Sequence, residues 1–385
     1  MLELDNLTGF PAQNYISIDQ LDRSYDVIAA KVSYDFEIDR LTGQTELSFT
    51  TIQSELCMAD EHYGAETKTS VQYESDLSPY KPYLDIIVNG TAYAPFDKPS
   101  KRFGAAISVG DYQKALAITG PRCWQKHGLG WSLGEPVAIS QLPIKYEYAF
   151  GGMQYIEEEL QASLFNPIGI GWYPTDYLKK LSTSNVLAAP QITHPSHPLE
   201  HISKPIRTEG FGFYGRSWQD RLQYSGTADE QWLKDRHPLL PTDFDMHYWN
   251  GAHPDLQFAH PKPNQIYDIK LFGLVRAQDV PKQHIALHIP VETLFAFIKT
   301  KQNIGLCKDL TLDTILICVE ERKIYCTYRV CLAEELEADQ TQLRFIAKDQ
   351  RQEQLELAQT MLKQNTDWFI PTPPSLTQNL KQKTI

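Results

Sequence analysis

The feature that most constrains the fold is a set of short strand-like segments separated by turn residues. The clearest pair is Thr311–Glu320 and Lys323–Leu332, which bracket a polar turn. A second pair lies at 26–39 and 45–52, and its first member alternates apolar and polar residues in its second half. Alternation with a period of two places successive side chains on opposite faces of a sheet. Both pairs are therefore predicted to be β-hairpins.

Regular patterning continues on both sides of a less regular middle. The chain has 20 Tyr, 16 Phe and 7 Trp, which favour strands, and 24 Pro and 21 Gly, which favour turns. Between 151 and about 263 the alternation weakens, and short helices and ordered loops are expected there, with one helix at Asp229–Arg236. Further strands are predicted at Tyr83–Val88, Ala105–Val109, Lys114–Thr119, Ile144–Phe150, Gln265–Leu274 and His284–Ile289.

These patterns predict a mainly β (α+β) protein. We expect antiparallel sheets in a sandwich-like body, long ordered loops, short helices and a C-terminal helix over 349–364. The predicted sections are an N-terminal antiparallel β section, a loop-rich middle with short helices, a second β section, and a C-terminal helix with a flexible tail, at 1–150, 151–264, 265–335 and 336–385. The sequence leaves open whether the two β sections share one core.

Charge and cysteine content exclude several classes of protein. With 36 basic and 48 acidic residues the net charge is −12, which argues against a nucleic-acid partner. No apolar run is long enough for a membrane span, so no membrane partner is expected. The start of the chain lacks the basic and apolar regions of a signal peptide, and the six cysteines form no CxxC pair. We expect a cytoplasmic protein with reduced cysteines, or one exported without a cleavable signal.

The candidate catalytic and metal-binding residues do not form any known catalytic or metal-binding sequence motif. The sequence contains no HExxH, GxSxG, phosphate-binding loop or dinucleotide fingerprint. Asp243 and Asp245 could form a carboxylate pair, but an Asp-x-Asp in a Pro-flanked loop is more typical of a turn or a helix cap. We therefore predict no catalytic residue, no metal and no cofactor. A metal-dependent hydrolase remains the alternative, using the middle-loop residues His194, His197, His201, His247, His253, His260, Asp243, Asp245 and Asp255.

Dense aromatic, glycine and charged segments stand out instead, at Tyr73–Asp85, Leu142–Gly152 and Phe165–Trp172. In the first of them, Lys81 can pair with Asp76 or Asp85 to hold a loop against a sheet. The glycines of the other two, Gly151, Gly152, Gly169 and Gly171, permit positive φ or a close backbone approach.

The ordered set of these segments resembles a bacterial family defined by a domain of unknown function, DUF2169, over roughly residues 5–332. Elements around Gly226–Trp232, Leu240–Asp245 and Asp313–Arg329 extend the resemblance. The residues that carry it, structural or partner-binding, are Tyr73, Asp76, Lys81, Pro82, Asp85, Tyr146, Glu147, Phe150, Gly151, Gly152, Asn166, Pro167, Gly169, Gly171, Asp243 and Asp245.

The resemblance implies a non-enzymatic cytoplasmic adaptor or chaperone of the type VI secretion system. Such a protein binds a secreted effector and aids its loading onto a VgrG or PAAR spike protein. Trp218, Arg221, Trp232 and Trp249 are candidates for partner binding, because interfaces favour Trp and Arg as anchors. The alternative is that these side chains pack the loops onto the sheets. The net charge predicts a basic or mixed binding face on the partner.

Overall fold

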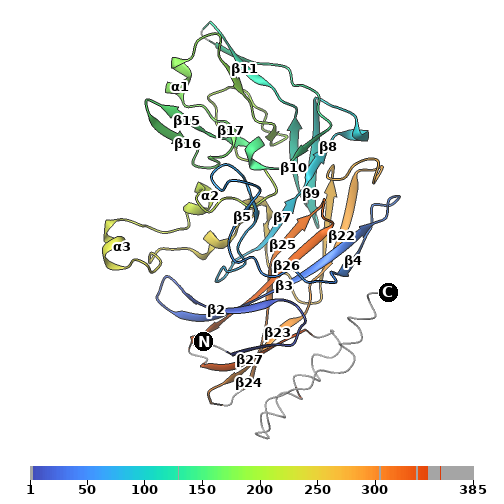
Figure 1. Cartoon of the computed structure of the whole chain (residues 1–385), viewed down its shortest axis with the longest axis vertical. Helices are drawn as coiled ribbons and strands as arrows, with labels where there is room; N and C mark the ends of the chain where they lie inside the picture. The colour runs from blue at the N-terminus through green and yellow to red at the C-terminus, as the bar shows by residue number, and fades with distance from the viewer. Residues whose placement is uncertain (1–2, 129, 303–304, 335–336, 346–355, 357–385) are drawn as a thin grey trace.

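The computed structural model describes residues 3–128, 130–302, 305–334, 337–345 and 356. It is mainly β, with several antiparallel sheets, long loops and three short α-helices, as predicted (Figure 1). None of the helices in these residues is long and apolar enough to cross a membrane. The predicted C-terminal helix lies, apart from Glu356, outside the described residues.

The largest sheet has seven strands and unites the two β sections. Both predicted hairpins are confirmed, since β3 pairs with β4 and β25 pairs with β26, each antiparallel. β26 also pairs antiparallel with β3, and β25 pairs parallel with β7, so residues about 230 to 310 positions apart in the chain are neighbours. The strand order is β2 (Ala12–Ile18), β3 (Ser24–Ile38), β26 (Lys323–Ala333), β25 (Thr311–Cys318), β7 (Leu84–Asn89) and β20 (Gln257–Phe258), with β4 (Thr45–Phe49) also on β3.

Two further sheets pack around this one. The predicted strands at Ala105–Val109, Lys114–Thr119, Gln265–Leu274 and His284–Ile289 form most of a five-stranded sheet, in the order β19 (Ile192–Thr193), β10 (Tyr112–Thr119), β9 (Arg102–Val109), β21 (Ile266–Phe272) and β22 (His284–Pro290). A four-stranded sheet was not predicted, and its order is β1 (Glu3–Asn6), β27 (Ala338–Phe345), β23 (Leu294–Thr300) and β24 (Gly305–Asp309). β27 lies beyond 335, where the sequence analysis ended the second β section.

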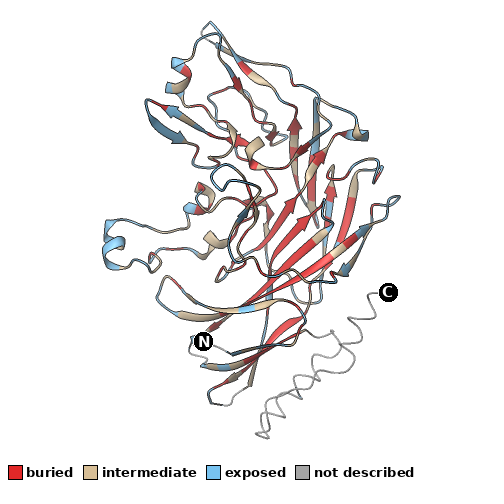
Figure 2. Ribbon diagram, in the orientation of Figure 1, coloured by how far each residue is buried: buried red, intermediate tan, exposed pale blue. Residues whose placement is uncertain are grey.

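One main hydrophobic core joins these sheets. It contains Ile28 and Val32 of β3, Ile107 of β9, Leu271 of β21 and Ile315 of β25. Buried residues accordingly run along the strands of the larger sheets in Figure 2. A smaller core, centred on Trp124, is enclosed by α1 (Thr175–Lys180) and the sheet formed by β11 (Cys123–His127), β12 (Gly130–Leu133) and β18 (Val186–Ala188).

The middle of the chain forms short elements, as expected. The predicted helix is present as α3 (Glu230–Asp235), and Asp229 caps it by accepting the Trp232 N–H at 2.8 Å. The remaining short elements are α2 (Gln219–Leu222), β5 (Glu61–His62), β6 (Val71–Tyr73), β8 (Thr91–Tyr93), β13 (Gln141–Pro143), β14 (Phe150–Gly151), β15 (Met153–Ile156), β16 (Glu159–Ala162), β17 (Ile170–Gly171) and the 3₁₀ turns η1 (Pro95–Asp97), η2 (Tyr146–Tyr148), η3 (Met246–Trp249) and η4 (Pro254–Leu256).

The strand predicted at Ile144–Phe150 is wrong, because the 3₁₀ turn η2 interrupts it. The Tyr146 amide donates to the Ser70 hydroxyl at 3.0 Å, where a strand would have used a neighbouring backbone. The Ser70 hydroxyl in turn donates to the Glu147 carboxylate. The alternation of apolar and polar residues in this segment therefore arises from a turn. Within it, Tyr146 is buried and Glu147 accepts a hydrogen bond from the distant Ser70.

The motif glycines allow the close packing that the sequence suggested. Gly151, Gly152 and Gly171 have positive φ, and a Cβ on Gly169 would lie 2.4 Å from Asn166 Nδ2. Asn166 is fully buried and donates to the Tyr146 and Phe150 carbonyls at 2.9 and 3.2 Å. The glycines thus let the backbone close around one buried amide.

We expect Gly151→Ala to destabilise the protein strongly, because its Cβ would lie 2.1 Å from the Asn166 carbonyl oxygen. Gly110→Ala is the matched control, since Gly110 also has positive φ but has no atom within 4 Å of an added Cβ. The control should lose about 1–2 kcal/mol from backbone strain alone. Urea denaturation measures both, and equal losses would contradict the close-packing explanation.

Candidate functional site: two buried charge clusters and an exposed apolar hairpin

The Tyr73–Asp85 motif supplies four of the ten members of a charge network between the largest sheet and the middle loops. We call it the central charge network. It contains five cations and five anions, so its formal charges balance. Most of these side chains are buried, with Arg216 and Asp60 at its partly exposed edge. The members are Lys31, Lys81, Arg216, Arg221 and Arg329, with Asp60, Glu74, Asp76, Asp85 and Asp313.

Asp85 is the most enclosed member, with 0% of its surface exposed at the start of β7. Of the two partners that the sequence allowed for Lys81, the structure selects Asp85, whose Oδ2 lies 2.9 Å from the Lys81 ammonium. Asp85 also accepts hydrogen bonds from Asn250 Nδ2 at 3.0 Å and the Gly251 N–H at 2.9 Å. One carboxylate thereby ties the central strand to a loop about 165 residues away.

Asp76 pairs with a different cation, the Lys31 ammonium on β3, at 2.5 Å. Its other oxygen accepts the Thr327 hydroxyl at 2.8 Å, from β26. On the same strand, Arg329 donates to Asp313 at 2.7 Å and to the Asp76 carbonyl at 2.7 Å. The motif loop is therefore fastened to three adjacent strands of the sheet.

Mutual neutralisation keeps these buried groups charged. Burial opposes the charge on Lys81, but the carboxylates of Asp85 and Glu74 raise its pKa above the ordinary value. Burial likewise opposes the charge on Arg329, and Asp313 outweighs it and raises the arginine's pKa. A cavity of about 20 Å³ lies among these side chains, which is room for about one water molecule. This volume is too small for an organic substrate.

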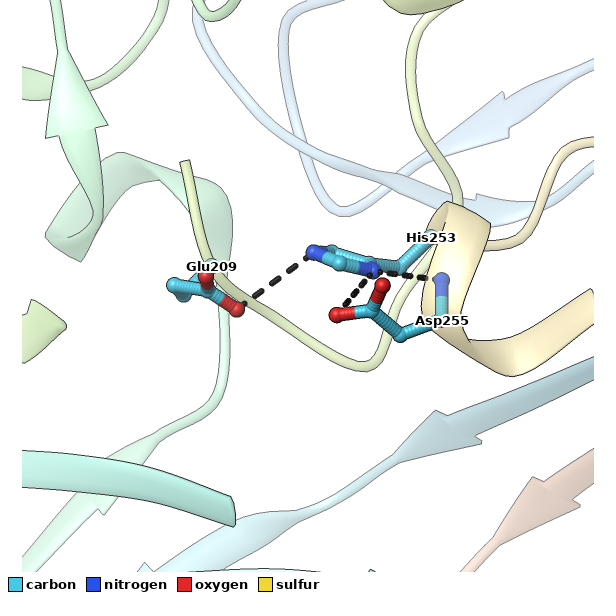
Figure 3. Close-up of side chains that lie close together, drawn as sticks. All are labelled: Glu209, His253 and Asp255. Atoms are coloured by element: carbon cyan, nitrogen blue, oxygen red, sulfur yellow. Dashed lines mark hydrogen bonds and ion pairs between the residues drawn. The ribbon is translucent and has the colours of Figure 1, made fainter. Parts of the chain in front are cut away.

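A second cluster lies under β10 and is shown in part in Figure 3. Glu209, His253 and Asp255 bring their ligand-type atoms within 4.8 Å of one another. The Lys114 ammonium contacts all three, by an ion pair to Glu209 and at 3.1 Å from His253 Nε2 and 3.3 Å from Asp255 Oδ2. Arg207 closes the cluster, with Nη1 at 2.9 Å from Asp255 Oδ2. Two cations therefore face two carboxylates around one imidazole.

Both ring nitrogens of His253 have polar neighbours. Its Nδ1 accepts the Asp255 N–H at 3.0 Å, and its Nε2 lies 3.4 Å from Glu209 Oε2 and 3.1 Å from Lys114 Nζ. Burial lowers the pKa of His253 below its ordinary value, and the charge of Lys114 adds to this. Burial opposes the charge on Glu209, but His253 and Lys114 outweigh it and lower the pKa of that carboxyl. The cluster holds a neutral histidine between charged neighbours.

This geometry supplies the three oxygen and nitrogen ligands that a metal would need, but the Lys114 ammonium already lies among them. A second positive charge there would be repelled by the buried lysine. The second charge cluster is therefore a set of packed and mutually paired side chains.

Two other predicted histidines, His194 and His197, contact each other on an exposed loop elsewhere, with Nδ1 atoms 3.1 Å apart.

Asp243 and Asp245 serve as turn and cap residues, as the sequence favoured. Asp243 accepts hydrogen bonds from the Thr227 N–H and hydroxyl at 2.8 and 2.7 Å. Asp245 caps η3 by accepting the His247 N–H at 2.8 Å. Among the described residues, neither carboxylate joins the group of Glu209, His253 and Asp255.

The other motif residues lie in the interior or beside it. Tyr146 is buried and donates its hydroxyl to the Gly212 carbonyl at 3.0 Å. Tyr73 is half-buried and donates to Glu321 Oε1 at 3.0 Å. Phe150 is buried, while Pro82 and Pro167 are half-buried. These motif residues therefore contact other parts of the chain and lie in the interior or at its edge.

The four predicted partner anchors have intramolecular roles. Trp218 is buried, with its ring 5.0 Å from that of Tyr146, and Arg221 is buried in an ion pair with Glu74. Trp232 is half-buried and donates to the Leu239 carbonyl at 2.9 Å, and Trp249 is half-buried 5.3 Å from the Arg216 guanidinium carbon. This placement favours the packing alternative for all four.

An exposed apolar surface lies instead on the hairpin β15–β16. Tyr155 and Leu160 are directly paired and share a face with Met153, and the following loop adds Leu164 and Phe165. Tyr155 is 72% and Leu164 67% exposed. We call these five side chains the apolar hairpin surface; Figure 1 shows the hairpin at the side of the molecule away from the largest sheet. A groove of about 600 Å³ adjoins it, with Met153, Leu160 and Trp218 in its lining.

The structure is that of a mainly β protein in which most of the motif residues are buried or half-buried and the hairpin β15–β16 exposes an apolar surface. The chain belongs to the family described as uncharacterized protein conserved in bacteria (DUF2169), which matches residues 22–329. The comparisons with curated proteins and with solved structures return no match.

Asp85→Asn should cost about 3–5 kcal/mol of folding free energy, because it leaves the buried Lys81 ammonium without its closest counter-charge. The control is Asp176→Asn, which removes an exposed partner of Lys179 and should change stability little. Chemical denaturation at neutral pH compares them, and similar effects would contradict the importance of the network.

The free energy of unfolding should fall as the pH drops below about 6.5. His253 is neutral in the folded state, whereas in the unfolded chain it takes up a proton near its ordinary pKa of 6.5. His253→Gln should flatten this dependence between about pH 7 and 5, and His201→Gln, on an exposed loop, should not. Denaturation curves across this range provide the test; an unchanged slope in His253→Gln would refute it.

Proposed function

We propose that this chain is a non-enzymatic cytoplasmic adaptor or chaperone that binds a type VI secretion effector and aids its loading onto a VgrG or PAAR spike protein. The observation that supports it most directly is the apolar hairpin surface. Soluble monomers rarely expose large apolar patches, and such a patch is typical of a site that binds another protein. The resemblance of the motif segments to secretion adaptors gives the class of partner.

The hairpin is suited to bind an extended segment of another protein. β15 and β16 pair only with each other among the described strands, so each has one backbone edge without a strand partner there. An added strand would use that edge for backbone hydrogen bonds, while Met153, Tyr155 and Leu160 offer apolar contacts on one face. Shielding an apolar effector segment in this way would limit its aggregation before export.

The charge clusters support a binding role over catalysis. Their acids and bases are paired with one another, and the larger cluster encloses a volume of only about 20 Å³. General acid–base or nucleophilic catalysis needs a group that can reach a substrate atom. The buried network instead makes a rigid body that presents the hairpin.

The test is affinity capture of the tagged full-length chain from its native cells, followed by mass spectrometry. One effector in near-stoichiometric yield is expected, and Tyr155→Glu combined with Leu160→Glu should abolish its capture, because two charges would be placed in the apolar contact. The control is Leu41→Glu, at an exposed turn residue distant in sequence from the hairpin.

Both variants should remain folded, since the altered side chains are exposed; circular dichroism checks this. Capture of no effector by the wild-type chain would refute the adaptor function. Equal capture by the hairpin variant and the wild type would place the binding surface elsewhere and remove the observation on which the proposal depends.

A further inference from the structure

A second hollow lies beside the hairpin, and its chemistry is more specific than that of the apolar surface. Its volume is about 580 Å³, within the range of ligand and peptide side-chain sites. We call it the Asp220 cleft. Its two charged lining residues are Asp220 and Arg207, and its apolar lining comes from Phe150, Leu164, Phe165, Trp172 and Ile206.

The positive charge in this cleft is already satisfied. Arg207 Nη1 lies 2.9 and 3.2 Å from the two carboxylate oxygens of Asp255. Asp255 raises the pKa of Arg207 although burial opposes its charge, so the guanidinium is held within the second charge cluster. That cluster balances two cations against two carboxylates without any contribution from Asp220.

Asp220 is the charged residue of the cleft that does not take part in this cluster. It lies in the first turn of α2, is half-buried, and its carboxylate has no hydrogen-bond or ion-pair partner within the described part of the chain. Burial raises the pKa of this carboxyl, and the charge of Arg207 offsets the effect only in part. Holding a carboxylate in a partly apolar cleft without a directly paired cation costs stability that a bound cation would recover.

We propose that the Asp220 cleft receives a lysine or arginine side chain from an apolar segment of the bound protein. This assignment rests on the proposed adaptor function and specifies the partner's chemistry. The cation would pair with the Asp220 carboxylate, and the net charge of −12 favours a basic partner at longer range.

The rest of the lining matches such a side chain. Trp172 and Phe165 offer aromatic surface to the aliphatic stem and to the cation. Leu164 also belongs to the apolar hairpin surface, so one segment can contact both the hairpin and the cleft. An acidic residue at the same position would meet the unpaired Asp220 carboxylate and be rejected.

The test uses a library of displayed random peptides selected on the full-length chain. Selected sequences should share a Lys or Arg flanked by apolar residues. In fluorescence anisotropy with one such peptide, Asp220→Asn should weaken binding about tenfold or more, because the charge-assisted pair is lost. Asp111→Asn, which removes the same charge from an exposed turn, should leave binding unchanged.

Replacing the peptide's basic residue with Gln should cost the wild-type chain the same factor and cost Asp220→Asn little, since both changes remove one interaction. Selection of peptides without a basic residue, unchanged binding by Asp220→Asn, or additive losses would each overturn the assignment. If effector capture succeeds while the peptide result fails, the adaptor function stands and the cleft assignment falls. If peptide binding depends on Asp220 but no effector is captured, the cleft's preference for a basic side chain stands and the adaptor function falls.

Discussion

The buried pairing of Lys81 with Asp85 is the interaction on which the rest of the structure depends. Lys81 reaches Asp85 at 2.9 Å and the Thr314 hydroxyl at 2.9 Å, and Asp85 holds the Asn250–Gly251 loop by side-chain and backbone donors. Charges in the interior are tolerated only when they are paired and hydrogen-bonded. Because each charge here needs its partner, the parallel pair β7–β25 and the middle loops are fixed in one mutual arrangement.

The charged side chains in the interior are paired within two clusters. In the central charge network and the second charge cluster, acidic and basic side chains pair with one another. The binding surface that we propose lies outside these clusters, at the exposed side chains of β15–β16 and at the carboxylate of Asp220. In a binding protein this division is expected, since a rigid scaffold lowers the entropy lost when a partner segment is ordered.

Several parts of the fold could be predicted because their signals are local. The hairpin β25–β26, the helix α3 with its Asp229 cap, and the cap role of Asp245 all depend on residues within a few positions of one another. The Ile144–Phe150 strand was wrong because a distant Ser70 hydroxyl binds the Tyr146 amide. Polar residues at Thr327 and Arg329, on a strand otherwise rich in apolar residues, were a signal of a buried charged face.

By itself, the sequence determined the mainly β class, the principal hairpins and the motif segments with their glycines and paired charges. Tertiary structure alone decided that Lys81 pairs with Asp85 and Asp76 with Lys31, and that Trp218 and Arg221 are buried. It also left the Asp220 carboxylate without an ion-pair partner among the described residues. The physical reason is separation along the chain. Alternation and capping act over a few residues, whereas ion pairing and burial depend on side chains that only the folded sheets bring together.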